Sequence, residues 1–179
     1  MEERRKLSME ELGRLSVQEF KGTEKLPLVV VLDNVRSLHN VGSAFRTCDA
    51  FRISKLYLTG ITGTPPHREI HKAALGATES VPWEYAEHTN DLIKELKGKG
   101  FEILAVEQTT HSLPLQNFKA DPVKKYCLVF GNEVEGVSDE VIALADISLE
   151  IPQSGTKHSL NISVCTGIVL WHVYRQLAL

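Results

Sequence analysis

The chain has 179 residues, of which 42% are apolar and 24% charged, and its formal net charge at pH 7 is −3. This is the length of one domain with a full hydrophobic core, which requires neither disulfides nor a structural metal. The charged start lacks the apolar core of a signal peptide, and no run approaches the roughly 20 apolar residues of a membrane span. We therefore expect neither a secreted nor a membrane protein.

The three cysteines, Cys48, Cys127 and Cys165, are an odd set without a CxxC pair. Each lies in an apolar stretch, as is typical of buried, reduced thiols, and we expect a cytoplasmic protein. Charge is segregated along the chain: residues 34–72 carry six Lys or Arg against two acids, whereas residues 126–150 carry six acids and neither Lys nor Arg. A positive face on an acidic chain is compatible with RNA binding through a restricted patch.

The predicted elements begin with a helical arm over residues 1–25. It starts at the capping-box pattern Ser8-Met9-Glu10-Glu11 and continues through Leu12 and Leu15 to Phe20. Strands are then predicted at 28–32, 55–59, 81–85, 102–106, 127–130 and 147–151. Helices are predicted at 41–51, 68–75, 89–96 (capped by Thr89), 138–144 and 160–177. This alternation predicts an α/β domain over residues 26–179, with a mostly parallel sheet sandwiched by helices.

Three segments rich in Gly, Asn and Ser follow predicted strands: Asp33–Gly42, Gly131–Ser138 and Pro152–Ser163. Folds of this class bind ligands beyond the carboxyl ends of their strands. We therefore expect these segments, although far apart in the sequence, to share one edge of the sheet.

Standard site motifs are missing from the sequence. There is no GxGxxG after the first strand, no P-loop and no GxSxG, which argues against dinucleotide, nucleoside triphosphate and hydrolase sites. His67 and His71 lie one turn apart on a predicted helix, but no third ligand accompanies them, and we expect no metal site.

Residue types alone leave alternatives open at the remaining polar positions. Glu133 is either a solvated turn residue or a functional carboxylate, and Ser159 and Asn161 are either helix caps or site residues. Arg46 is either a surface cation or part of a site. On residue types alone, the sequence predicts a ligand-binding α/β domain.

Three blocks, in order, resemble the SpoU branch of the SPOUT superfamily, which includes the TrmH-type RNA ribose methylases. The first, NVGSAFRTCDAF at residues 40–51, is similar to NxGxxxRTAxAFG, with Cys48 for the usual Ala and Arg52 where Gly is common. The second, VFGNEVEGV at residues 129–137, matches GxExxG. The third, IPQ at 151–153 followed by SLNISV at 159–164, is similar to IPM…SLNVSVA, with Gln153 for Met. The resemblance covers about residues 28–179.

This resemblance implies an S-adenosylmethionine-dependent RNA 2′-O-ribose methyltransferase with a deep C-terminal trefoil knot, in which the chain after Gln153 threads through a preceding loop. The cofactor would lie in the knot, held by main-chain groups near Gly131, Ile151 and Leu160, with Thr109 in the pocket wall. Relatives of this type form homodimers through the knot region.

The resemblance also implies catalytic roles. Arg46 would activate the ribose 2′-hydroxyl or position it through a phosphate, Asn40 would orient Arg46 or the substrate, and Glu133, Ser159 and Asn161 would support the reacting ribose. Methyl transfer from a sulfonium is an in-line displacement that requires orientation of the hydroxyl and no metal. The implied RNA phosphate contacts are Arg36, Arg52, Lys55, Arg68 and Lys72.

Three other functions are weighed against ribose methylation: methylation of an RNA base, RNA binding by a non-catalytic paralogue, and a small-molecule α/β enzyme without RNA. The short arm at residues 1–25, in place of a separate RNA-binding domain, favours a compact RNA such as tRNA. The D-loop guanosine is the best-known target of similar chains, while ribosomal RNA and the anticodon loop remain open.

Overall fold

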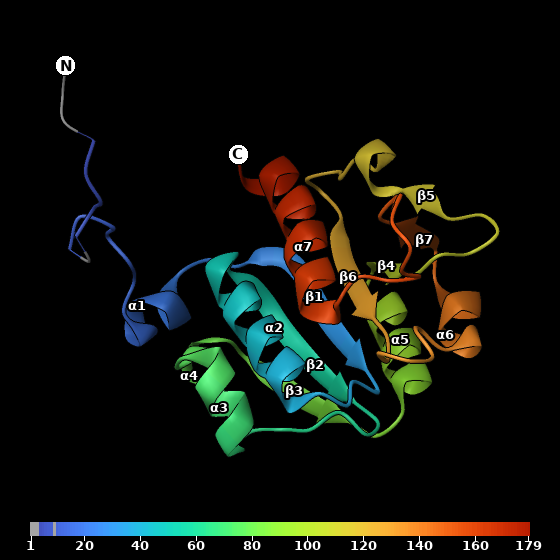
Figure 1. The fold of residues 1–179 in the computed structure, drawn as a ribbon, viewed down its shortest axis with the longest axis horizontal. Coiled ribbons are helices and arrows are strands. Elements are labelled where there is room, and N and C mark those ends of the chain that lie inside the picture. The colour runs from blue at the N-terminus through green and yellow to red at the C-terminus, as the bar shows by residue number, and fades with distance from the viewer. Residues whose placement is uncertain (1–3, 9) are drawn as a thin grey trace.

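The computed structural model describes residues 4–8 and 10–179, and in this part seven strands form one sheet in the order β3-β2-β1-β6-β4-β7-β5 (Figure 1). Every neighbouring pair is parallel, which confirms the predicted α/β class. The strands are β1 (Leu26–Asp33), β2 (Ile53–Thr59), β3 (Trp83–Ala86), β4 (Phe101–Val106), β5 (Leu113–Pro114), β6 (Lys125–Phe130) and β7 (Ile147–Glu150).

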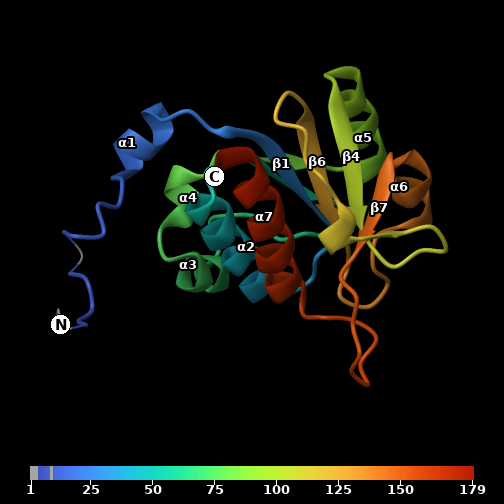
Figure 2. The ribbon, with the colours of Figure 1, turned by 90° about the horizontal axis from the view of Figure 1, so that it is seen from above.

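Helices cover both faces of the sheet (Figures 1 and 2). One face carries α2 (Leu38–Ala50), α3 (Arg68–Ala74), α4 (Ala77–Ser80) and α7 (Ile162–Ala178), and the other carries α5 (Thr89–Gly98) and α6 (Asp139–Leu144). The alternation of side chains along β1 explains the two layers. Val30 and Leu32 pack into the core on the first face, whereas Val29 and Val31 pack on the second. A strand buried on both faces accounts for the continuous apolar run of β1.

A topological switch point lies between β1 and β6. These strands are neighbours, but the chain leaves β1 towards α2 on one face and leaves β6 towards α6 on the other. Loops that diverge in this way open a crevice at the carboxyl ends of the strands, where ligands bind in this fold class.

The close packing of α2 on α3 explains the glycine of the first sequence block. A Cβ atom at Gly42 would lie 2.5 Å from the carbonyl oxygen of Ile70 and 2.7 Å from the Cβ of Ala73. Both neighbours belong to α3, so any side chain at this position would force the two helices apart.

The N-terminal helix is shorter than predicted. The capping-box hydrogen bonds between Ser8 and Glu11 do form, but only a turn follows them. Leu12 and Leu15 are exposed, so an extended helix would bury no apolar face there. The helix α1 (Val17–Gly22) begins later, with a capping box of its own. Met9 lies outside the described residues.

Two further details differ from the sequence prediction. The residue that caps α5 is His88, and the hydroxyl of Thr89 instead donates to the buried Asp33 carboxylate at 2.6 Å. The sequence analysis also missed β5, α4 and the short 3-10 helix η1 (Leu115–Asn117). These elements have two to four residues each, which is too short for a hydrophobic period to appear.

Candidate functional site

The carboxylate of Glu133 lies at the amino end of α2. Its Oε2 accepts a hydrogen bond from the Arg36 N–H at 2.9 Å, and its Oε1 accepts from the Ser37 N–H and the Asn40 side-chain amide, both at 3.0 Å. A carboxylate at this end also faces the positive end of the helix dipole. The loop after β6 is thereby fixed to the loop after β1, across the switch point.

These contacts determine the protonation state of Glu133. Burial alone raises the pKa of its carboxyl group. The hydrogen bonds from the Arg36 N–H, the Asn40 amide and the Ser37 N–H outweigh burial, so that the pKa lies below its ordinary value. Glu133 is therefore ionised at neutral pH and acts as a hydrogen-bond acceptor.

A continuous chain of hydrogen bonds joins the three sequence blocks. Asn40, which is 8% exposed, donates to Glu133, and its Oδ1 accepts from the Asn161 side-chain amide at 3.3 Å. Asn161 is also the N-cap of α7, because its Oδ1 accepts from the N–H and the hydroxyl of Ser163 at 2.9 and 2.6 Å. Asn161 therefore caps the helix and also belongs to the site. The expectation that the three polar segments share one edge of the sheet is confirmed.

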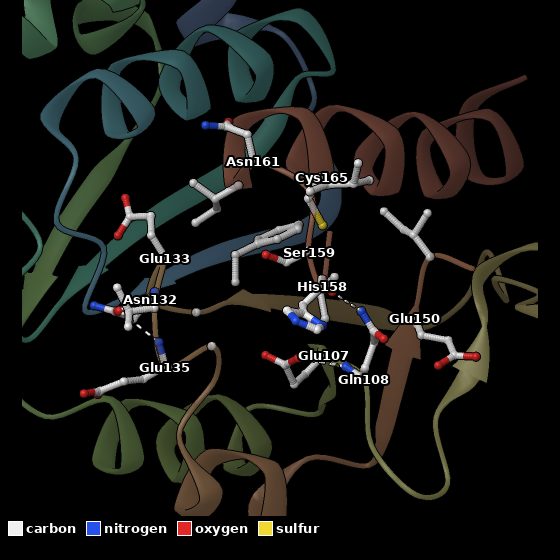
Figure 3. A pocket seen from close by; sticks show the side chains of 18 of the residues that line it. Glu107, Gln108, Asn132, Glu133, Glu135, Glu150, His158, Ser159, Asn161 and Cys165 are labelled. Atoms are coloured by element: carbon white, nitrogen blue, oxygen red, sulfur yellow. Dashed lines mark hydrogen bonds between the residues drawn. The ribbon is translucent and has the colours of Figure 1, made fainter. Parts of the chain in front are cut away.

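A first pocket, of about 420 Å³, lies beside this chain of hydrogen bonds (Figure 3). Its volume falls within the roughly 300–1,000 Å³ that is usual for small-molecule sites. No Lys or Arg lines this pocket, whereas four of its lining residues are acidic: Glu107, Glu133, Glu135 and Glu150. This lining favours a ligand that carries positive charge.

Most of the residues predicted around the cofactor line this first pocket. Gly131, Ile151 and Leu160 do so, and so does the predicted catalytic residue Ser159. A Cβ atom at Gly131 would lie 2.1 Å from the backbone carbon of Gly136, so glycine is required for the loop to fold back on itself. The loop thereby presents backbone rather than side chains to the pocket.

Thr109 is not among the residues that line the first pocket. Its N–H donates to the Ser112 hydroxyl at 3.3 Å, and its carbonyl accepts from the same hydroxyl at 3.0 Å, which closes a local turn beyond the pocket. Glu107 and Gln108, the first two residues after β4, form this wall instead. The predicted loop therefore does line the pocket, through the neighbours of Thr109 and not through Thr109 itself.

Asn132 is a site residue that the sequence analysis missed. It is 8% exposed, and its amide donates to the carbonyl oxygen of Asn34 at 2.7 Å. Its Oδ1 accepts from the N–H groups of Val134 and Glu135 at 2.8 and 3.2 Å (Figure 3). Asn132 thus shapes the loop that carries Glu133. A Gly-Asn pair directly after a strand is a recognisable signal for such a turn, which the Asn side chain closes.

Cys165 is the one cysteine among the lining residues of the first pocket. Burial, together with the negative charge of Glu107, raises the pKa of its thiol to about 11. The thiol is therefore protonated at neutral pH and is not a nucleophile.

A second pocket, of about 380 Å³, contains Arg46 and Lys72, and no acidic residue is among those that line it. Ser163, in the first turn of α7, also lines it. Two cations near a helix amino end favour an anion such as a phosphate. Arg68 is exposed one turn before Lys72 on α3, and the exposed Arg36 lies beside Glu133.

Two predicted RNA contacts lie away from both pockets. Arg52 and Lys55 are at the opposite, amino edge of the sheet, where the Arg52 carbonyl accepts from the N–H of Leu26 at the start of β1. Lys55 forms an ion pair with Glu84 at 3.0 Å. Charge density in the sequence does not show at which end of the strands a residue lies, and the structure does not bring these two predicted contacts to either pocket.

Within residues 4–8 and 10–179, the structure has no group of three or more His, Cys, Asp or Glu side chains that could hold a metal ion. His67 instead caps α3, with its Nδ1 accepting from the Glu69 N–H at 3.2 Å. No helix in this described part of the chain is both long and apolar enough to cross a membrane.

The fold and its pockets define an α/β domain with an acidic pocket beside a basic one. The chain belongs to the SpoU rRNA Methylase family, whose model matches residues 27–171. The tRNA (guanosine(18)-2′-O)-methyltransferase of Aquifex aeolicus is 38% identical over 156 residues, which are 83% of this chain and 69% of the relative. The enzyme of the same name from Thermus thermophilus is 30% identical over 166 residues, which cover 93% of this chain and 84% of the relative.

Solved structures agree with this family. The A. aeolicus TrmH/SpoU tRNA modifying enzyme has a TM-score of 0.79 at 32% identity, covering 89% of this chain and 81% of that one. The AdoMet-bound rRNA methyltransferase from Sinorhizobium meliloti has a TM-score of 0.78 at 31% identity, and the match covers 92% of this chain and 62% of that one. The family resemblance drawn from the three sequence blocks is confirmed.

The Glu133→Gln variant should be less stable than the wild type at pH 7, because an amide oxygen is a weaker acceptor than a carboxylate. The folded-state pKa of Glu133 is lowered, so its contribution is complete above the ordinary value of 4.5 and is lost as the pH falls through the folded value. The thermal unfolding midpoints of the two proteins should therefore converge as the pH falls below 4.5 and through the lowered folded-state pKa. The control is Glu87→Gln at an exposed position. A gap that does not narrow at any acidic pH at which both proteins remain folded would contradict this account.

Proposed function

We propose that the protein is an S-adenosylmethionine-dependent RNA 2′-O-ribose methyltransferase. The observation that carries this proposal is the position of the Glu133–Asn40–Asn161 hydrogen bonds, which lie between an acidic pocket and a basic one. The acidic pocket suits the sulfonium cation, and the basic pocket suits a phosphate of the RNA backbone. Membership of an RNA methylase family, and the bound AdoMet of the S. meliloti relative, support the same conclusion.

When bound, S-adenosylmethionine would supply a methyl group: the ribose oxygen would attack the methyl carbon in line, the bond from that carbon to the sulfur would break, and the hydroxyl proton would pass to water. The residues of this chain orient the hydroxyl at the boundary of the two pockets. The side-chain nitrogens of Asn40 and Asn161 each have a second N–H beyond those in the hydrogen-bond chain, and these can hold the ribose. The guanidinium of Arg46 would hold the phosphate and stabilise the negative charge that develops on the ribose oxygen.

The RNA substrate is tRNA, with the D-loop guanosine as the target nucleotide. The relatives from A. aeolicus and T. thermophilus, whose names specify guanosine 18 of tRNA, support this choice, and a tRNA substrate agrees with the expected cytoplasmic location. Ribosomal RNA is the second candidate, supported by the S. meliloti rRNA methyltransferase. Exposed Arg36 and Arg68, together with Lys72, would contact the RNA backbone.

The active form is a homodimer. Three apolar side chains on one side of α7 are 39–51% exposed and recur every three or four residues, at Val164, Ile168 and Trp171. Leu160, two residues before the helix, is 37% exposed and extends this stripe. Val164 also lines the second pocket, so a copy that covers this stripe would lie against Arg46. The dimer expected from the family resemblance would use this surface.

The methyltransferase domain spans residues 26–179, with residues 1–25 as an arm, and its C-terminal part is knotted. In support of the knot, the segment between β7 and α7 passes next to the segment between β4 and β6, where Gln108 donates to the carbonyl of His158. Beyond it, α7 holds the same β4–β6 segment through Gln176, which accepts from the Ala120 N–H at 3.0 Å.

Transfer of labelled methyl groups from S-adenosylmethionine to separate pools of unmodified tRNA and rRNA tests the function. After digestion to nucleosides, we expect the label in 2′-O-methylguanosine from tRNA. Label found only in rRNA would retain the ribose chemistry and reject the tRNA substrate. Label found on a base would reject ribose methylation, and bound cofactor without transfer to either pool would favour a non-catalytic RNA-binding protein.

The Arg46→Ala variant should lose turnover by orders of magnitude while its affinity for S-adenosylmethionine stays close to that of the wild type, because Arg46 lies outside the first pocket. Single-turnover methyl transfer and calorimetric titration measure the two quantities. The control Lys55→Ala removes a cation at the other edge of the sheet and should keep full activity. Loss of cofactor binding in Arg46→Ala would show that the role assigned to Arg46 is wrong.

Mixed dimers test whether Arg46 acts across the subunit boundary. Arg46→Ala and Asn161→Ala chains with different tags are each inactive alone. If Arg46 completes the site of the partner, each mixed dimer contains one intact site, and an equal mixture should recover about one quarter of the wild-type rate. If Arg46 acts within its own chain, no dimer contains an intact site, and the mixture stays inactive.

A further inference from the structure

Two consecutive residues after β4 contact the two loops that enclose the first pocket. The Oε2 of Glu107 accepts from the Val137 N–H at 3.0 Å, and its Oε1 accepts from the Gln108 N–H at 2.9 Å. The side-chain amide of Gln108 donates to the carbonyl oxygen of His158 at 3.0 Å (Figure 3). The first contact reaches the loop after β6, and the second reaches the segment that connects β7 to α7.

The loop after β6 is pressed directly against Glu107. A Cβ atom at Gly136 would lie 2.1 Å from the Glu107 Oε2, and Gly136 has a φ of +71°. The second glycine of the GxExxG block is therefore required both by its backbone conformation and by the carboxylate against it. This wall of the pocket cannot move inwards, and the hydrogen bond to Val137 keeps it from moving outwards.

The opposite wall has less support of its own. Residues 152–160 are all exposed, and the segment projects from the body of the protein (Figure 2). It contains Ser159 and Leu160, which line the first pocket. Gln108 bonds to this segment one residue before Ser159, so it sets how far the segment stands from β4.

We propose that Glu107 and Gln108 act as a two-armed clamp that sets the separation of the two pocket walls, and so determines the affinity for S-adenosylmethionine. This inference rests on the proposed function. In this proposal both act as positioning residues through the loops that carry Gly136 and Ser159, in addition to lining the first pocket themselves. A pocket whose walls are already held at the spacing that the ligand needs binds it more tightly, because less conformational entropy is lost on binding.

The Gln108→Met variant removes the amide donor and keeps a side chain of similar length. We expect the Kd for S-adenosylmethionine to rise about five- to tenfold, as loss of one hydrogen bond implies. The KM for the cofactor should rise in parallel, while kcat at saturating cofactor and the KM for RNA stay unchanged. The melting temperature without ligand should change by no more than about 2 °C.

The matched control is Gln116→Met, an exposed glutamine in η1 outside the pocket, which should bind the cofactor as the wild type does. A second variant, Glu107→Gln, tests the other arm. Because Glu107 and Gln108 together determine the distance between the two pocket walls, loss of either contact lets the walls separate. The double variant should therefore bind no more than about twofold weaker than the weaker single variant, a clear departure from additivity.

An unchanged cofactor Kd in Gln108→Met would overturn the clamp, and so would fully additive losses in the double variant. A loss of kcat at unchanged cofactor KM would also overturn it, because Gln108 would then act on the reacting groups or the RNA. Calorimetry on the wild-type chain separates this failure from that of the proposed function. A wild type that binds no S-adenosylmethionine overturns the function and the clamp together, whereas normal wild-type binding with unaffected variants overturns the clamp alone.

Discussion

The site depends on one carboxylate placed at a helix amino end. Glu133 accepts hydrogen bonds from two backbone N–H groups before α2 and from the amide of Asn40, and these bonds keep its pKa low despite burial. The loops after β1 and β6 depart to opposite faces of the sheet, and this carboxylate connects them, together with the Asn132 amide that donates to the carbonyl of Asn34. Asn40 then extends the connection to Asn161, so that three distant segments share one geometry.

Charge divides the site into two compartments. The first pocket is lined by four glutamates and by no Lys or Arg. The second pocket is lined by Arg46 and Lys72 and by no acidic residue. A sulfonium and a phosphodiester carry opposite charges, and each is stabilised in only one compartment. In the proposed reaction, the hydroxyl that receives the methyl group would lie at the boundary of the two pockets, where the two asparagine amides are.

The spacing of hydrophobic residues along the chain was enough to predict the α/β class and the main helices and strands. The polar segments that follow strands were enough to predict that these segments meet at one edge of the sheet. They did not predict the bond between Asn40 and Glu133, because these residues are 93 positions apart and no local pattern encodes their contact. Local signals also misled. Ser8 makes its capping-box bonds without a helix, because Leu12 is exposed, and the hydroxyl of Thr89 bonds to Asp33 instead of capping a helix.

Helix geometry places Asn40 and Arg46 on different sides of α2 within one chain. Asn40 and Arg46 lie on α2, six positions apart, which corresponds to about 240° around the helix and about 9 Å along its axis. Since Asn40 faces Glu133 and Asn161, Arg46 must face elsewhere, and it lines the second pocket beside the exposed side of α7. The side of α2 that supplies the orienting amide therefore cannot also supply the cation to the same cofactor pocket. A second copy on the apolar stripe of α7 would bring a cofactor pocket to Arg46 without any change in the fold of either chain.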